Sequence, residues 1–282
     1  MNVSRSVLPG PQDVIQHNQK IILGLIWHLI LRYQIFGGQP APEQEKEGVK
    51  KKPHKKPPAK KILLKWLQSQ MPPSLPVKNL SSDWNDGKHL SALVDSMKPG
   101  LIPDYETQVP SDALHNTQNA MDIAEEKFGI PKVIKPEHLC VEQPDELSVM
   151  TYLSYFCSGH DSPGHSSLLA WVREQIPEYN IQNFTTDWND GKALSALVNA
   201  LADGSMPNHA ELDPDKGVEN VRNAIKAAEE NLDGIAAYMS PEDFATDSLT
   251  MMGYIGSFRK ATPKRHTPVT SPGKVSIVFV HP

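Results

Sequence analysis

The sequence DWNDGK occupies residues 83–88 and returns unchanged at residues 187–192, an offset of 104 residues. Apolar residues follow each copy at positions i, i+3, i+4 and i+7. They are Leu90, Leu93, Val94 and Met97 after the first copy, and Leu194, Leu197, Val198 and Leu201 after the second. This spacing places them on one face of an α-helix. An offset of about 100 residues is too long for a solenoid unit, so it predicts two copies of a whole small domain.

The repeat extends to both sides of this motif, because apolar residues at helical spacing precede and follow it in both copies. The matched residues are Leu63, Trp66 and Leu67 with Leu168, Trp171 and Val172 upstream, and Val149, Tyr152, Leu153 and Phe156 with Met251, Tyr254, Ile255 and Phe258 downstream. Four apolar helical stripes per copy, joined by turns that carry Pro and Gly, predict an all-α domain of four main helices.

Three residues of the repeated motif have an expected structural role. Trp84 and Trp188 are expected to be core aromatics, and Asp86 and Asp190 to cap the first turn of the following helix. The glycine after each of these aspartates either allows close backbone packing or adopts left-handed backbone geometry, two alternatives that the sequence leaves open.

A truncated third copy is expected ahead of the two full ones. Residues 21–36 are apolar nearly all round, and a helix of that kind needs to be buried. Their uninterrupted apolar run is shorter than the ~20 residues of a membrane span, so we interpret them as the closing helix of a domain whose body is absent. The expected order is a remnant at 1–36, a Pro- and Lys-rich linker at 37–59, a full copy at 60–158, a short linker at 159–165, a full copy at 166–260 and a tail at 261–282.

The chain carries 28 basic and 33 acidic residues, a net charge of −5, and the two signs are segregated. The full copies are acidic, whereas residues 39–61 hold eight Lys and three Glu. This cationic run is either a solvated linker or a contact for an acidic partner, such as a filament or an anionic lipid surface. No nucleic acid is expected as a partner, because no aromatic residue is interleaved for base stacking and the acidic copies would repel phosphate.

The sequence shows no arrangement of residues that supports catalysis, so no enzyme activity, metal or cofactor is expected. A calcium loop beginning at Asp83 would need an acidic residue where Val94 stands, and one beginning at Asp213 would need it where Ala224 stands. The histidines show no metal-ligand spacing. The two cysteines are too few for a disulfide framework and are expected to be reduced thiols of a cytoplasmic protein.

The repeated pattern resembles the calponin homology (CH) domain. The residues that carry the resemblance are Leu-Leu-x-Trp, then Asp-Trp-x-x-Gly-x-x-Leu-x-x-Leu-Val, then Asn-x-x-x-Ala-x-x-x-Ala. Residues 62–158 resemble the second CH domain of a filamin-type actin-binding pair, 166–260 resemble a further copy, and 21–33 resemble the closing helix of the first domain of such a pair. Three consecutive CH domains are similar to the arrangement in insect filamin-like proteins, of which this chain would be a short isoform or a fragment.

The resemblance implies a cytoskeletal protein that binds F-actin in the cytoplasm, with affinity weakened by the absent domain body. In filamin-type pairs the closing helix of the first domain and the opening helix of the second contact the filament. The residues implied here are Lys20, Ile22, Leu25, Ile26, Leu29, Arg32, Tyr33, Lys60, Lys61, Lys65 and Trp66, and phosphoinositide contact is implied for Lys55, Lys56, Lys60 and Lys61. The acidic last copy is expected to be a spacer or to bind another protein. The alternative is a non-catalytic adaptor that binds proteins or phosphoinositide membranes.

Overall fold

The computed structural model describes residues 59–158, 161–235, 239–245 and 247–264, and five residues of the N-terminal segment, which are Gln12, Ile15, Gln16, Ile22 and Leu25. Within the predicted remnant helix, Ile22 and Leu25 are helical and half-buried. The rest of that helix and the predicted linker up to residue 58 lie outside the described residues.

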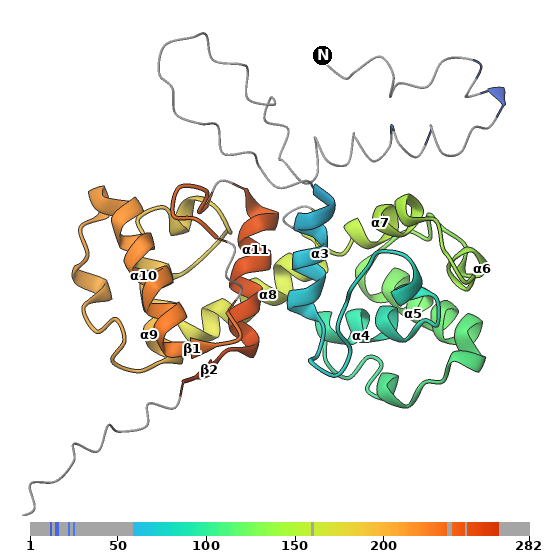
Figure 1. The fold of residues 1–282 in the computed structure, drawn as a ribbon, viewed down its shortest axis with the longest axis horizontal. Coiled ribbons are helices and arrows are strands. Elements are labelled where there is room, and N and C mark those ends of the chain that lie inside the picture. Colours follow the sequence, from blue (N-terminus) through green and yellow to red (C-terminus); the bar gives the residue numbers. More distant parts are fainter. Residues whose placement is uncertain are drawn as a thin grey trace, which may run out of the picture.

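Two repeats of similar architecture make up the described chain, and each has four main helices (Figure 1). The first repeat contains α3 (Ala59–Gln70), α4 (Lys88–Met97), α5 (Ala113–Phe128) and α7 (Glu146–Ser154), with the short helices η2 (Ser82–Trp84), η3 (Tyr105–Thr107), η4 (Pro110–Asp112) and α6 (Pro136–Leu139). The second contains α8 (Pro163–Gln175), α9 (Lys192–Leu201), α10 (Gly217–Asn231) and α11 (Ser248–Ser257), with η5 (Pro177–Tyr179), η6 (Thr186–Trp188), η7 (His209–Glu211), η8 (Pro214–Lys216) and η9 (Phe258–Lys260). The all-α prediction is confirmed.

The second repeat begins and ends at different residues from those expected. Its first helix α8 starts at Pro163, inside the stretch expected to be a linker, and the Ser162 hydroxyl accepts a hydrogen bond from the His165 backbone N–H. Beyond residue 260, β2 (Thr262–Pro263) pairs antiparallel with β1 (Leu232–Asp233). The folded part therefore extends through residue 264 rather than ending at residue 260.

The repeated DWNDGK motif builds the same turn in both repeats. The Trp84 indole N–H donates to the Asn79 carbonyl at 3.1 Å, and the Trp188 indole N–H donates to the Asn183 carbonyl at 2.8 Å. Asp86 accepts a hydrogen bond from the first backbone N–H of α4 at 2.9 Å, and Asp190 does the same for α9. Both bind the first turn as predicted, but from the position before the N-cap, which is Gly87 or Gly191. Both tryptophans are buried in the core, which confirms the structural interpretation of the motif.

The glycine of this motif meets both conditions that the sequence left open. Gly87 has a φ of +77° and Gly191 a φ of +74°, in the left-handed region. A Cβ atom on Gly87 would also lie 2.6 Å from the Thr117 backbone nitrogen, and one on Gly191 would lie 2.7 Å from the Asn220 Cβ. The motif therefore holds the start of the third helix of each repeat, where Asn116 and Asn220 donate to the Asp86 and Asp190 carbonyls.

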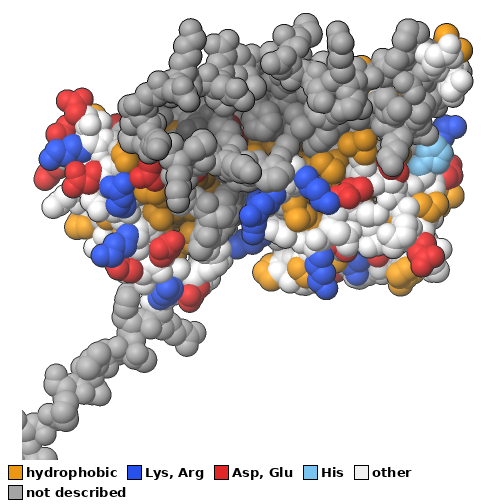
Figure 2. Space-filling model, turned by 45° about the horizontal axis from the view of Figure 1, so that its top comes forward, with side chains coloured by type: hydrophobic (Ala, Val, Ile, Leu, Met, Phe, Trp, Pro, Cys, Tyr) orange, Lys and Arg blue, Asp and Glu red, His pale blue; other side chains and the backbone are white. Residues whose placement is uncertain are grey.

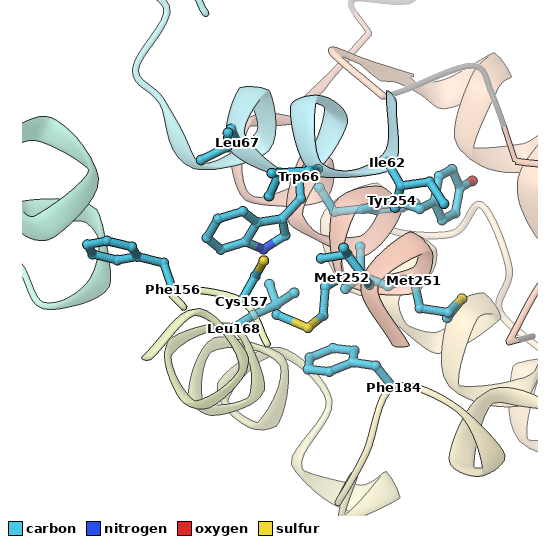
Figure 3. Close-up of a cluster of buried hydrophobic side chains, with 14 of the residues drawn as sticks. Ile62, Trp66, Leu67, Phe156, Cys157, Leu168, Phe184, Met251, Met252 and Tyr254 are labelled. Carbon is cyan, nitrogen blue, oxygen red and sulfur yellow. The ribbon is translucent and has the colours of Figure 1, made fainter. Parts of the chain in front are cut away.

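The two repeats pack closely, with α3 of the first repeat lying along α11 of the second in the centre of the molecule (Figure 1). Glycines permit the approach, because a Cβ on Gly256 would lie 2.6 Å from the Ser69 hydroxyl oxygen and one on Gly164 would lie 2.4 Å from the Trp66 ring. Trp66 points toward Leu168 of α8 and Met252 of α11 (Figure 3). One apolar core consequently runs through both repeats.

Candidate functional site

The helix α3 carries four of the eleven residues implied to contact a filament, namely Lys60, Lys61, Lys65 and Trp66. Two more, Ile22 and Leu25, are described as half-buried helical residues. The remaining implied contacts lie outside the described residues, and so do two of the four implied phosphoinositide contacts. These are Lys20, Ile26, Leu29, Arg32 and Tyr33 for the filament, and Lys55 and Lys56 for the lipid.

The two sides of α3 face different surroundings. Ile62, Leu63 and Leu67 are buried in the core, so this side anchors the helix. Lys60 and Lys61 are exposed at its N-terminal end. The Lys60 ammonium pairs with the Glu146 carboxylate at the start of α7, and both side chains remain about half exposed. An exposed ion pair of this kind contributes about 0–1 kcal/mol and leaves both groups accessible to a partner.

The charge at the start of α3 runs against the usual preference of a helix. The N-terminal end of a helix carries partial positive charge, so acidic residues are stabilising there and basic ones are not. The first turn of α3 has no acidic residue and holds Lys60 and Lys61. The field of the helix and these two ammonium groups have the same sign, and the Glu146 carboxylate offsets part of the charge of Lys60. On the face shown in Figure 2, some basic side chains lie near the middle, and others lie among acidic ones on both sides.

Trp66 does not lie on the surface of this site. Its side chain is fully buried, with 0% of its area exposed, and it packs between the repeats (Figure 3). Its indole N–H has no hydrogen-bond partner among the described residues. In this arrangement Trp66 cannot touch a filament, so its interpretation as a core residue is correct and its place among the contact residues is not supported. The reason is the contact between repeats, which the spacing of one helix does not reveal.

Two basic residues at the end of the second repeat make long-range contacts that sequence reasoning did not single out: Lys260 joins the two repeats, and Arg259 binds α8 of its own repeat. The Lys260 ammonium donates to the carbonyls of Gln68 and Met71 at the C-terminal end of α3. Burial and the nearby Arg259 guanidinium lower the pKa of Lys260 to about 8. Arg259 lies over the Trp171 ring at 5.9 Å and donates to the Ser167 carbonyl at 2.6 Å, and burial lowers its pKa as well. The sequence signal that could have identified these residues is the presence of two adjacent basic residues in an otherwise acidic domain.

The described residues hold an open cleft but no metal-binding cluster. They contain no group of three or more His, Cys, Asp or Glu side chains that could hold a metal ion. An open cleft of about 300 Å³ lies between the end of α5 and the start of α8, and Asp161 is the single acidic residue in its lining. Among these residues, no helix is both long and apolar enough to cross a bilayer.

The cysteines Cys140 and Cys157 are free thiols.

A family model describes both repeats of the chain. The calponin homology (CH) domain model matches residues 57–160 and 163–264. The chain belongs to the calponin homology domain family. The second match begins at the first helical residue of α8 and ends at residue 264, in agreement with the extent of the second CH domain in the structure.

Curated relatives match about half of this CH-domain chain. It is 42% identical to rat Filamin-C over 151 residues, which cover 54% of the chain and 5% of that protein. It is 40% identical to Filamin-A of Drosophila melanogaster over 146 residues, 51% of the chain and 6% of the relative. The mouse erythrocytic spectrin beta chain is 38% identical over 149 residues, 52% of the chain and 7% of the relative. The matched region is therefore a small fraction of each of these much longer proteins.

Among solved structures, the actin-crosslinking core of Schizosaccharomyces pombe fimbrin matches 88% of this CH-domain chain and 54% of its own chain. The sequence identity is 20% and the TM-score is 0.36, a likeness too weak to add to the family assignment.

Proposed function

We propose that this CH-domain protein binds F-actin in the cytoplasm, and that the filament contacts the N-terminal end of α3. The observation that carries the proposal is the exposed pair Lys60 and Lys61 in a helical first turn without any acidic residue. Charges that work against the helix cost stability, and proteins keep such violations mainly where a partner uses them. An actin filament presents acidic surface, so the pair complements it.

The rest of α3 supports this arrangement by holding the site rigid. Its buried side is fixed by both CH domains, and Lys260 of the second domain satisfies the carbonyls at its C-terminal end. Binding at this site therefore does not require the loss of conformational entropy that ordering a loop would cost. Ile22 and Leu25 of the predicted remnant helix, both half-buried helical residues, are the second part of the proposed contact.

Co-sedimentation of the full chain with F-actin at low and high salt tests the proposal. Because the proposed contact is between exposed charges, the pelleted fraction should fall steeply as salt rises. A chain that stays in the supernatant at low salt would contradict the proposal. The full chain is needed, since a chain beginning at residue 166 would lack the Ser162 cap of α8 and expose the side of α11 that packs on α3.

The alternative function is an adaptor that binds anionic phosphoinositide membranes through the same lysines. Lys61 is exposed, so it is accessible to either partner. Flotation of the full chain with vesicles, with and without phosphoinositide, separates the two functions. Binding to phosphoinositide vesicles without binding to F-actin would replace the filament proposal by the adaptor. Filament binding with no lipid-dependent flotation would remove the adaptor.

A further inference from the structure

The segment after the last helix of the second CH domain is fixed to the end of α10 by a short antiparallel pairing. Thr262 lies opposite Asp233 and Pro263 lies opposite Leu232. The Lys264 backbone N–H donates to the Asn231 carbonyl at 2.8 Å, and its ammonium donates to the Glu229 carbonyl at 2.5 Å. In Figure 1 the two strands lie side by side below α9 and α10. The pairing is short, so only a few hydrogen bonds hold it.

Thr262 combines an exposed hydroxyl with a distinctive sequence context. Its side chain and that of Pro263 are both exposed, and the chain is extended there. The sequence from residue 262 is Thr-Pro-Lys-Arg, in which proline follows the hydroxyl residue directly and a basic residue stands three positions on. Proline-directed serine/threonine kinases select substrates by this order of residues and bind them in extended form.

We propose that Thr262 is a phosphorylation site for a proline-directed kinase, and that the phosphate releases the segment 261–264 from α10. In the reaction the Thr262 hydroxyl oxygen attacks the γ-phosphorus of ATP, the bond from that phosphorus to the bridging oxygen breaks, and ADP leaves. The hydroxyl proton goes to the catalytic aspartate of the kinase. The kinase and ATP come from outside, and this chain supplies the acceptor hydroxyl of Thr262.

The surroundings of Thr262 make a phosphate unfavourable in the paired state. Residues directly opposite in an antiparallel pair have side chains on the same face, and like charges there are destabilising. A phosphate of about −1.5 to −2 charge would therefore stand beside the Asp233 carboxylate. It would also stand near the C-terminal end of α10, where the helix carries partial negative charge and where its last turn holds Glu229 and Glu230.

Lys264 is the cation best placed to form an ion pair with the phosphate, and forming this ion pair also opens the pairing of the strands. Residues 262 and 264 point to the same side of an extended chain. Drawing the Lys264 ammonium to the phosphate removes it from the Glu229 carbonyl that it now caps. Repulsion between the phosphate and Asp233 and attraction between the phosphate and Lys264 consequently both favour opening of the pairing between β1 and β2.

The effect should extend to the contact between the CH domains. Gly234 packs against the Lys260 carbonyl, where an added Cβ would lie 3.4 Å away, and Lys260 in turn holds the end of α3. Release of residues 261–264 therefore loosens the residue that joins the second CH domain to α3. This consequence does not depend on filament binding, so its failure would leave the proposed function untouched.

The test uses the full chain, ATP and a purified cyclin-dependent kinase as the probe enzyme. Mass spectrometry should place phosphate on Thr262 in the wild type and not in Pro263→Ala, which keeps the hydroxyl and removes the proline. Thr267-Pro268 and Ser271-Pro272 share the dipeptide and report whether the kinase is active on the chain. Phosphate on either of them without phosphate on Thr262, or no phosphate anywhere, would overturn the assignment.

Hydrogen exchange measures the second half of the proposal. The Lys264 amide, which donates to Asn231, should exchange about tenfold faster after phosphorylation. Thr262→Glu should reproduce part of this increase. Thr262→Gln, whose side chain is uncharged and of the same size as glutamate, should not. Phosphorylated Thr262 with unchanged exchange at Lys264, or equal exchange in the Glu and Gln variants, would show that the phosphate does not open the pairing.

Discussion

The ammonium group of Lys260 donates a hydrogen bond of 3.0 Å to the carbonyl of Gln68, which lies 192 residues earlier in the chain. The last helical turn of the second CH domain thereby satisfies carbonyls at the end of the first helix of the first CH domain, where a cation is favoured by the helix dipole. The two domains share α3 as a structural element. The lysines proposed to bind the filament thus sit on a helix whose stability depends on both domains.

The buried position of Lys260 predicts a pH dependence of stability. Its pKa is about 8 in the folded protein and 10.5 in the unfolded chain, so the unfolded state binds more protons between these values. Stability contributed by this group therefore rises as pH increases from 8 to 10.5, by about 1–2 kcal/mol after allowance for partial solvent screening. The measurement is the free energy of unfolding in urea for wild type and Lys260→Met across this range.

The comparison with the variant is needed because other groups act in the opposite direction. Burial raises the pKa values of the Cys157 thiol and the Tyr152 hydroxyl, so the folded state retains protons there that the unfolded chain loses at high pH. These contributions are common to both proteins and cancel in the difference. A difference between wild type and Lys260→Met that stays constant with pH would contradict the assignment.

The close approach of Gly164 to Trp66 predicts that Gly164→Ala destabilises the protein. The added Cβ would lie 2.4 Å from the indole ring, so the helices must move apart at a cost of about 1–3 kcal/mol. Alanine otherwise favours a helix over glycine, so any loss arises from the contact. Ser166→Ala, at an exposed position of the same helix, is the matched control and should change stability by less than about 0.5 kcal/mol. Equal effects of the two substitutions would argue against close packing at this point.

The repeated glycine predicts a larger effect for Gly87→Ala. Left-handed backbone costs alanine about 1–2 kcal/mol, and the Cβ would meet the Thr117 backbone nitrogen at 2.6 Å, so the total loss should be on the order of 3 kcal/mol. Gly100 separates the two causes, since its φ is +93° and nothing lies within 4 Å of an added Cβ. Gly100→Ala should lose only the backbone part. If both variants melt at the same temperature, the clash is absent.

The two cysteines should differ in reactivity with a thiol reagent. The attacking species is the thiolate, and burial both shields Cys157 and raises the pKa of its thiol. Cys140 is half-buried, and its sulfur lies 3.3 Å from the Thr117 hydroxyl oxygen. One thiol per native chain should therefore react rapidly, and Cys140→Ser should abolish that phase. Two thiols that react at equal rates without denaturant would contradict the burial of Cys157.

Much of the fold could be predicted because its signals are local and occur twice. The apolar spacing that begins at Leu90 and at Leu194 corresponds to α4 and α9, and the Asp86 carboxylate binds the first backbone N–H of α4 from the position before the N-cap residue Gly87. The start of α8 was missed although Ser162 and Pro163 form a favourable cap and first helical position. The pairing of Thr262 with Asp233 is too short to produce a periodic pattern.

The candidate site was predictable only in part, for a different reason. Charge composition identifies Lys60 and Lys61, because basic residues at the start of a helix can be recognised from the sequence alone. The burial of Trp66 and the role of Lys260 arise where the two CH domains meet, and both depend on contacts with residues far away in the chain. Helical spacing shows that Trp66 needs a partner, and it does not show that the second domain provides one.

Charge reversal at the start of α3 tests the central claim most directly. The measurement is F-actin co-sedimentation of the full-length double variant Lys60→Glu with Lys61→Glu, beside Lys127→Glu with Lys226→Glu. The control pair makes the same change in net charge at exposed lysines of α5 and α10. The first pair should weaken binding at least about tenfold and the control pair less than about twofold, while both retain a melting temperature within a few degrees of wild type. Equal binding by the two variants would contradict the assignment of the filament contact to α3.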